Sequence, residues 1–116
     1  MGRLTTHVLD TAHGRPGAGV SIELYRMGTT RERIATATTN TDGRCERPLL
    51  EGTAFAAGTY ELVFHAGDYF AGQGIALPHP RFLDEVVVRF GVSDPAAHHH
   101  VPLLISPYGY STYRGS

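Results

Sequence analysis

Side chains that favour the protein interior recur at every second position along much of this chain. The clearest runs are residues 20–25, 60–65 and 86–91, where every second residue is Val, Ile, Leu, Phe or Tyr. Each run is short, rich in β-branched or aromatic residues, and bounded by Gly, Pro or Asp. This is the pattern of β-strands that bury one face, and we predict a strand in each run.

Two further runs carry apolar side chains on both faces. In residues 4–9 one face holds Leu4, Thr6 and Val8, and the other holds Thr5, His7 and Leu9. In residues 98–105 one face holds Val101, Leu103 and Ile105, and the other holds His98, His100, Pro102 and Leu104. A two-layer sandwich buries only one face of each sheet, so we expect another subunit to cover the second face.

Turn-forming residues separate the runs. Asp42-Gly43 and residues 13–17 predict tight turns. Residues 68–73 predict the one helix, with Asp68 as its N-cap and Gly74 as its C-terminal stop. About seven or eight short strands with so little helix predict an all-β fold, an antiparallel β-sandwich.

Composition narrows the function classes. The chain has 116 residues, and we expect a single domain over 1–116. A formal net charge of -1 with 18% charged residues gives no basic surface for nucleic acid. No apolar run approaches the ~18 residues of a membrane span. Residues 1–6 lack an apolar signal segment, and we expect a cytoplasmic protein.

The basic residues and the cysteine exclude further chemistry. All 10 basic residues are arginine, so no lysine is present for Schiff-base or phosphate chemistry. The single cysteine, Cys45, excludes an internal disulfide and a thiolate metal cluster. Paired with a distant histidine, Cys45 is too weak a basis for a thiol enzyme.

The run His98-His99-His100 is the most conspicuous cluster of titratable residues. On a strand, His98 and His100 point to one face and His99 to the other. Two histidines on one face suit a transition metal, but two ligands do not make a site. Acid–base chemistry and solvated or packed histidines remain as the other interpretations, since imidazole titrates near neutral pH.

Two other features attract attention. Arg44 directly follows the Asp42-Gly43 turn, where it is either a solvated arginine or a fixed cation for an anionic substrate or oxyanion. Residues 108–116 hold three tyrosines and predict a terminal strand rather than a frayed tail.

Taken together, these motifs resemble the transthyretin-related proteins, and among them the 5-hydroxyisourate hydrolases of urate degradation. The resemblance covers residues 3–116 and rests on five segments in order: 4–10 (Leu-Thr-Thr-His-Val-Leu-Asp), 41–44 (Thr-Asp-Gly-Arg), 67–70 (Gly-Asp-Tyr-Phe), 100–104 (His-Val-Pro-Leu-Leu) and 113–116 (Tyr-Arg-Gly-Ser). It implies a β-sandwich of two four-stranded sheets with one short helix. It also implies a homotetramer, a dimer of dimers with active sites in a channel between dimers.

The resemblance also implies a reaction and the residues for it. Water opens a ring amide of 5-hydroxyisourate and gives the carboxylate 2-oxo-4-hydroxy-4-carboxy-5-ureidoimidazoline, with no cofactor and no metal. The implied catalytic residues are His7, Arg44 and His100. Tyr113, Ser116 and His98 join His7 and Arg44 as implied substrate-binding residues, whereas the variable residue His99 points away.

Two alternatives remain open. A transthyretin-like carrier would share the fold without catalysis, but such binders lack the His/Arg/His set and the Tyr-Arg-Gly-Ser end. A metal-dependent hydrolase built on His7, His98 and His100 would lose activity to a chelator, which the leading interpretation does not predict.

Overall fold

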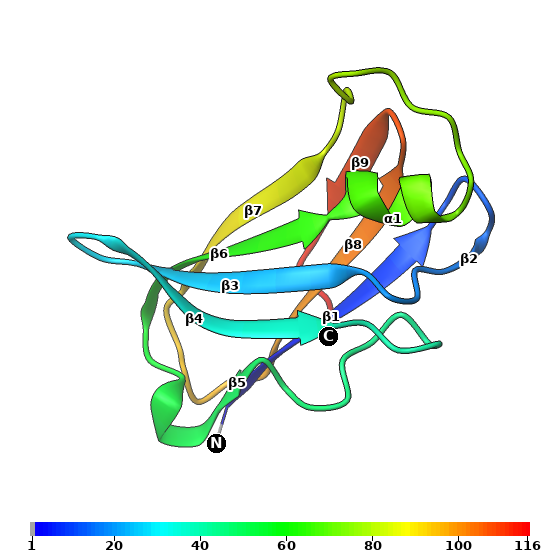
Figure 1. Cartoon of the computed structure of the whole chain (residues 1–116). Coiled ribbons are helices and arrows are strands. Elements are labelled where there is room, and N and C mark those ends of the chain that lie inside the picture. The colour runs from blue at the N-terminus through cyan, green and yellow to red at the C-terminus, as the bar shows by residue number, and fades with distance from the viewer. Residues whose placement is uncertain (1) are drawn as a thin grey trace.

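The computed structural model describes residues 2–116 (Figure 1). In this range the strands are β1 (Arg3–Asp10), β2 (Arg15–Pro16), β3 (Ser21–Met27), β4 (Arg31–Thr38), β5 (Leu50–Glu51), β6 (Gly58–His65), β7 (Glu85–Val92), β8 (His99–Ser106) and β9 (Gly109–Thr112). One α-helix, α1 (Ala66–Gly72), follows β6, and a short 3-10 turn, η1 (Gly52–Ala54), follows β5. Within the described range, no helix combines the length and the apolar character that crossing a membrane requires.

The strands form two sheets around one core. One sheet has the order β2-β1-β8-β9, with β5 also paired to β1, and the other has the order β4-β3-β6-β7. Their facing residues make a continuous apolar cluster that includes Leu4, Ile22, Leu62, Phe64 and Leu103. The predicted all-β sandwich with one short helix is confirmed.

The prediction that all strands run antiparallel is wrong for one pair. β1 and β8 lie side by side and parallel, with Leu4 opposite His99 at one end of the pairing and Asp10 opposite Ile105 at the other. Parallel neighbours need a long crossover between them, and the whole second sheet lies on the chain between β1 and β8. The sequence period gives the face of each residue but not the direction of the neighbouring strand.

Two strands differ from the expectation. β4 was not predicted, because this edge strand, with residues such as Arg33 and Thr36 exposed, shows no clear alternation of buried positions. The terminal strand β9 ends at Thr112, so Tyr113 and the residues after it extend beyond the sheet.

The helix begins earlier than predicted. α1 starts at Ala66, and no side chain caps it, so Asp68 lies in the first turn and binds Arg81 at 2.7 Å instead. The predicted stop is confirmed. Gly74 has a φ of 82°, its N–H donates to Ala71 O at 3.1 Å, and the N–H of Ile75 donates to Phe70 O at 3.2 Å. Those two bonds form a Schellman motif, which a left-handed glycine favours.

The last residue of β1, Asp10, is a buried carboxylate. Asp10 is fully buried and accepts hydrogen bonds from His13 Nδ1 at 2.6 Å and from the Tyr69 hydroxyl at 2.8 Å. Burial raises the pKa of Asp10, but the hydrogen bonds from His13 and Tyr69 outweigh it and hold that pKa below its ordinary value. This cluster joins β1 to α1.

Replacing Asp10 by alanine should lower the free energy of unfolding by about 1–3 kcal/mol, because Tyr69 and His13 lose their buried acceptor. Since the folded pKa lies below the unfolded one, this stabilisation is complete above the ordinary carboxyl pKa and is lost as the pH falls through the folded value. Urea unfolding at about pH 7 and about pH 3 measures both effects. The control, Asp68→Ala, removes a carboxylate that is 71% exposed and should cost less than about 1 kcal/mol. Equal losses in the two variants would contradict the prediction.

Candidate active site

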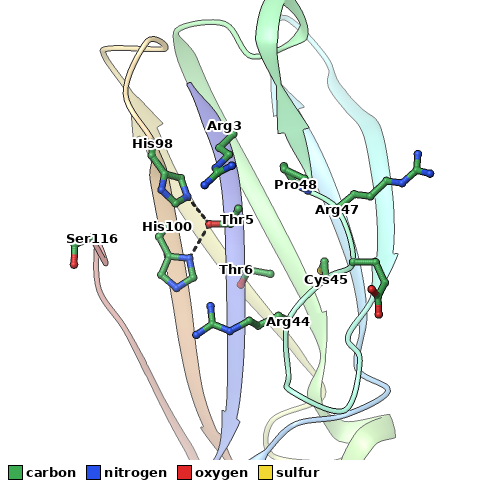
Figure 2. A pocket seen from close by; sticks show the side chains of 11 residues that line it. Arg3, Thr5, Thr6, Arg44, Cys45, Arg47, Pro48, His98, His100 and Ser116 are labelled. Carbon is green, nitrogen blue, oxygen red and sulfur yellow. Dashed lines mark hydrogen bonds between the residues drawn. The ribbon is translucent and has the colours of Figure 1, made fainter. Parts of the chain in front are cut away.

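A hollow of about 390 Å³ opens on the outer face of the five-stranded sheet (Figure 2). Residues from four separate segments line it: Arg3, Thr5, Thr6, Arg44, Cys45, Glu46, Arg47, Pro48, His98, His100 and Ser116. Four of the predicted site residues, Arg44, His98, His100 and Ser116, therefore come together here.

The parallel pairing of β1 with β8 sets the centre of the hollow. Thr5 stands opposite His100 in the register, and both side chains lie on the outer face. The Thr5 hydroxyl lies 2.8 Å from His100 Nδ1 and 2.8 Å from His98 Nε2. Sequence reasoning placed Thr5 on the face of His7 but did not select it, because only the register brings it to the two histidines.

A tight turn brings Arg44 to β1, as the Asp42-Gly43 pair predicted. The Asn40 side-chain oxygen accepts from the N–H of Asp42 at 2.9 Å and from that of Arg44 at 3.1 Å. Gly43 has a φ of 75°, and a Cβ there would lie 2.3 Å from the Val8 carbonyl oxygen. Only glycine meets both demands, so this position fixes how closely the Arg44 segment approaches β1.

His7 lies beside the hollow rather than in its wall. It faces Arg44 as a single antiparallel pair, and its Nε2 lies 3.0 Å from the carbonyl oxygen of Asp42. A carbonyl only accepts, so Nε2 of His7 carries a proton and donates it to this oxygen. His7 is not among the residues that line the hollow.

The last residues of the chain line two different hollows. The N–H of Gly115 donates to His100 O at 2.8 Å, which sets Ser116 at the hollow. Tyr113 is 60% exposed and lines a separate hollow of about 260 Å³ with Arg89, Phe90 and others. Within one chain, Tyr113 shares this second hollow with His99 and does not line the hollow of His98 and His100.

The electrostatics favour a neutral His100 and an anionic ligand. Burial lowers the pKa of His100, and the charges of Arg44, His98 and His7 lower it further. A neutral imidazole can accept a proton at neutral pH. Among the lining residues, Arg3, Arg44 and Arg47 outnumber the one acid, Glu46.

His99 points into the protein, as the strand alternation predicted. It is 5% exposed, and its ring meets Phe55 edge-on at 5.4 Å between centroids. Its Nδ1 donates to Ala97 O at 3.0 Å. His99 therefore belongs to the packing between the sheets.

Thiol and metal chemistry find little support in the arrangement. Burial raises the pKa of Cys45, which keeps it a thiol although it borders the hollow. Within residues 2–116, no three side chains of His, Cys, Asp or Glu are grouped so that they could hold a metal ion. The metal-dependent alternative needed such a group at His7, His98 and His100.

Comparison with known proteins gives the family. Residues 4–115 match the HIUase/Transthyretin family. The chain belongs to this family. A Pseudomonas aeruginosa relative named 5-hydroxyisourate hydrolase is 63% identical over 117 residues, covering 100% of this chain and 93% of that protein.

Three solved structures agree with the fold. The Klebsiella pneumoniae 5-hydroxyisourate hydrolase is 35% identical, with a TM-score of 0.83 and full coverage of both chains (100% and 100%). Sea bream transthyretin in complex with thyroxine is 27% identical, with a TM-score of 0.86 and coverage of 97% of this chain and 94% of that one. An (S)-allantoin synthase is 44% identical with a TM-score of 0.94, and the match covers 99% of this chain but 44% of that longer one. The predicted transthyretin-like architecture is confirmed.

Within this HIUase/Transthyretin fold, His99 and His100 should respond differently to substitution. His100→Ala should lower turnover of 5-hydroxyisourate by roughly 10²-fold, the usual scale for loss of a general base. His99→Ala should keep turnover within about twofold of the intact protein and lower the free energy of unfolding by about 1–2 kcal/mol, because its packing on Phe55 is lost. Turnover assays and urea unfolding of both variants measure this. Equal losses of turnover would mean that the two side chains share the site.

Proposed function

We propose that this chain hydrolyses 5-hydroxyisourate to 2-oxo-4-hydroxy-4-carboxy-5-ureidoimidazoline in purine degradation. The observation that carries the proposal is the pairing of a half-buried imidazole, His100, with the Arg44 cation in one open hollow. Relatives that match the full chain and are named for this activity support it. We assign the activity to one domain over residues 1–116, and a cytoplasmic location stays a prediction from the sequence.

The proposed reaction begins with proton transfer from water. Water gives a proton to His100 Nε2 while its oxygen adds to the ring carbonyl carbon. The carbonyl oxygen then becomes negative, and the Arg44 guanidinium stabilises it and binds the acidic edge of the substrate. The ring C–N bond breaks, the nitrogen takes up a proton, and the carbonyl carbon becomes the carboxylate of the product.

The other predicted residues support this step. His7 Nε2 donates to the carbonyl of Asp42 in the turn that carries Arg44. With His100 it forms the pair that polarises the attacking water, as the family resemblance implies. His98 and Ser116 line the space where the planar substrate binds. Tyr113 lies outside the hollow in one chain, and its part in substrate binding stays a prediction.

A carrier of small molecules is the second candidate, because the fold matches a transthyretin solved with thyroxine. Three arginines and two histidines line the hollow of this chain. Those groups suit a small polar anion better than a hydrophobic hormone. The activity assay below decides between the two functions.

The intact protein should accelerate the decay of freshly made 5-hydroxyisourate, followed by an ultraviolet time course with no metal added. Arg44→Gln should lower the rate by roughly 10²-fold, because the developing oxyanion loses its cation. Arg33→Gln removes an arginine that is 58% exposed on β4, in the other sheet, and should leave the rate unchanged. No acceleration by the intact protein would reject the hydrolase and favour the carrier.

We further propose that the active form is a homotetramer, a dimer of dimers. Leu9 and Leu104 are only half-buried in one chain and lie on the same outer face as His100, although the chain itself already buries Pro102. A second copy that covers this face would close the hollow into a shared channel. Light scattering at micromolar concentration should give about four times the chain mass of 12.6 kDa. A monomer mass would contradict the shared channel.

A further inference from the structure

The Thr5 side chain is hydrogen-bonded to both histidines of the hollow. Its hydroxyl oxygen is 2.8 Å from His98 Nε2 and 2.8 Å from His100 Nδ1 (Figure 2). A hydroxyl has a single proton, so it donates to one ring and accepts from the other. Of the two nitrogens that face Thr5, His98 Nε2 and His100 Nδ1, one must therefore carry a proton and the other must be bare.

Arg44 decides the direction of this chain of hydrogen bonds. In Figure 2 the end of the His100 ring that carries Nε2 lies on the side of the Arg44 guanidinium. A guanidinium has donors and no acceptor, so a proton on Nε2 would set donor against donor, whereas a bare lone pair there faces a cation favourably. The proton of neutral His100 then sits on Nδ1 and is donated to Thr5. The hydroxyl of Thr5 in turn donates to His98 Nε2.

We propose that Thr5 is a positioning residue that keeps His100 Nε2 bare and relays a proton from His100 to His98. This inference rests on the proposed hydrolysis and deepens it. As water adds to the substrate carbonyl, His100 Nε2 gains the water proton and His100 Nδ1–H passes its proton to Thr5 Oγ1. Thr5 passes its own hydroxyl proton to His98 Nε2. Thr5 and His100 end neutral, the latter as the other tautomer, and the positive charge rests on His98.

The surroundings of the two rings explain why the charge moves outward. His100 is half-buried, and burial together with the charge of Arg44 lowers its pKa, so an imidazolium there is unfavourable. His98 is exposed, and water solvates and screens a charge at that position. Arg3, Arg47 and Glu46 are the other charged residues that line the hollow, and the Arg47 guanidinium is directed away from the two rings (Figure 2). The relay separates the new charge from the guanidinium without moving any heavy atom.

Substitutions at Thr5 test the hydroxyl bridge between His98 and His100 while both histidines stay in place. Thr5→Val removes the hydroxyl, keeps the shape and suits a strand, and should lower kcat about tenfold or more while KM changes less than about threefold. Thr5→Ser keeps the hydroxyl and should restore kcat to within about threefold of the intact protein. The control, Thr11→Val, removes a hydroxyl that bonds Ile105 O at 2.9 Å at the end of β1 and should not change kcat. Unchanged kcat in Thr5→Val would overturn the proposal.

A double-mutant cycle separates a relay from two independent effects. His98→Gln can still accept a hydrogen bond from Thr5 but cannot take its proton, and it should lose about as much kcat as Thr5→Val. Because both residues belong to one chain of hydrogen bonds, the kcat of the double variant should be no lower than that of the less active single variant. Losses that multiply in the double variant would overturn the relay.

Nitrogen NMR of the His100 ring tests the direction without any substrate. At neutral pH we expect the proton on Nδ1 in the intact protein and a raised share of Nε2–H in Thr5→Val. A proton on Nε2 in the intact protein would overturn the inference even if hydrolysis is confirmed. An inactive intact protein would instead reject the proposed function, and the ring measurement would then decide the direction of the hydrogen-bond chain by itself.

Discussion

The parallel contact between β1 and β8 is the interaction on which the site depends. It sets Thr5 opposite His100 and leaves both side chains on the outer face. The inner faces of the same strands hold the register, because Leu4, Val8, Leu103 and Ile105 are fully buried. A slip by one residue would expose these side chains and turn Thr5 and His100 into the core. Core packing therefore fixes the position of groups that are themselves not in the core.

β1 also receives the segment that carries the cation. The N–H of Val8 donates to Gly43 O at 2.8 Å, so the turn is bonded to the same strand that holds Thr5 and His7. This explains why Arg44, more than thirty positions from Thr5 in the sequence, shares a hollow with it. Burial and the charge of Arg44 both lower the pKa of His100. In the proposed reaction the same cation would also stabilise the oxyanion.

The sequence predicts which face of a sheet a side chain occupies better than it predicts which strands pair. The period of two correctly set His98 and His100 apart from His99, and the Asp-Gly pair correctly predicted the turn before Arg44. The parallel direction of β8 and the contact of Thr5 with His98 and His100 were missed, because strand pairing is decided by the packing of the whole core and not by local alternation. Tyr113 shows the same limit, since a motif at the chain end does not say which hollow its side chain will line.

Net charge and local charge lead to different conclusions here. The formal net charge of -1 argues against a polyanion as partner, and nothing in the hollow changes that. At the site, however, three arginines and one glutamate line the hollow that holds His100, whose pKa is lowered by burial and by the charge of Arg44. A small anion responds to the charges within about one Debye length, roughly 8 Å, rather than to the sum over the surface. A molecule that is nearly uncharged as a whole can therefore still present a locally positive hollow to the small anion of the proposed reaction.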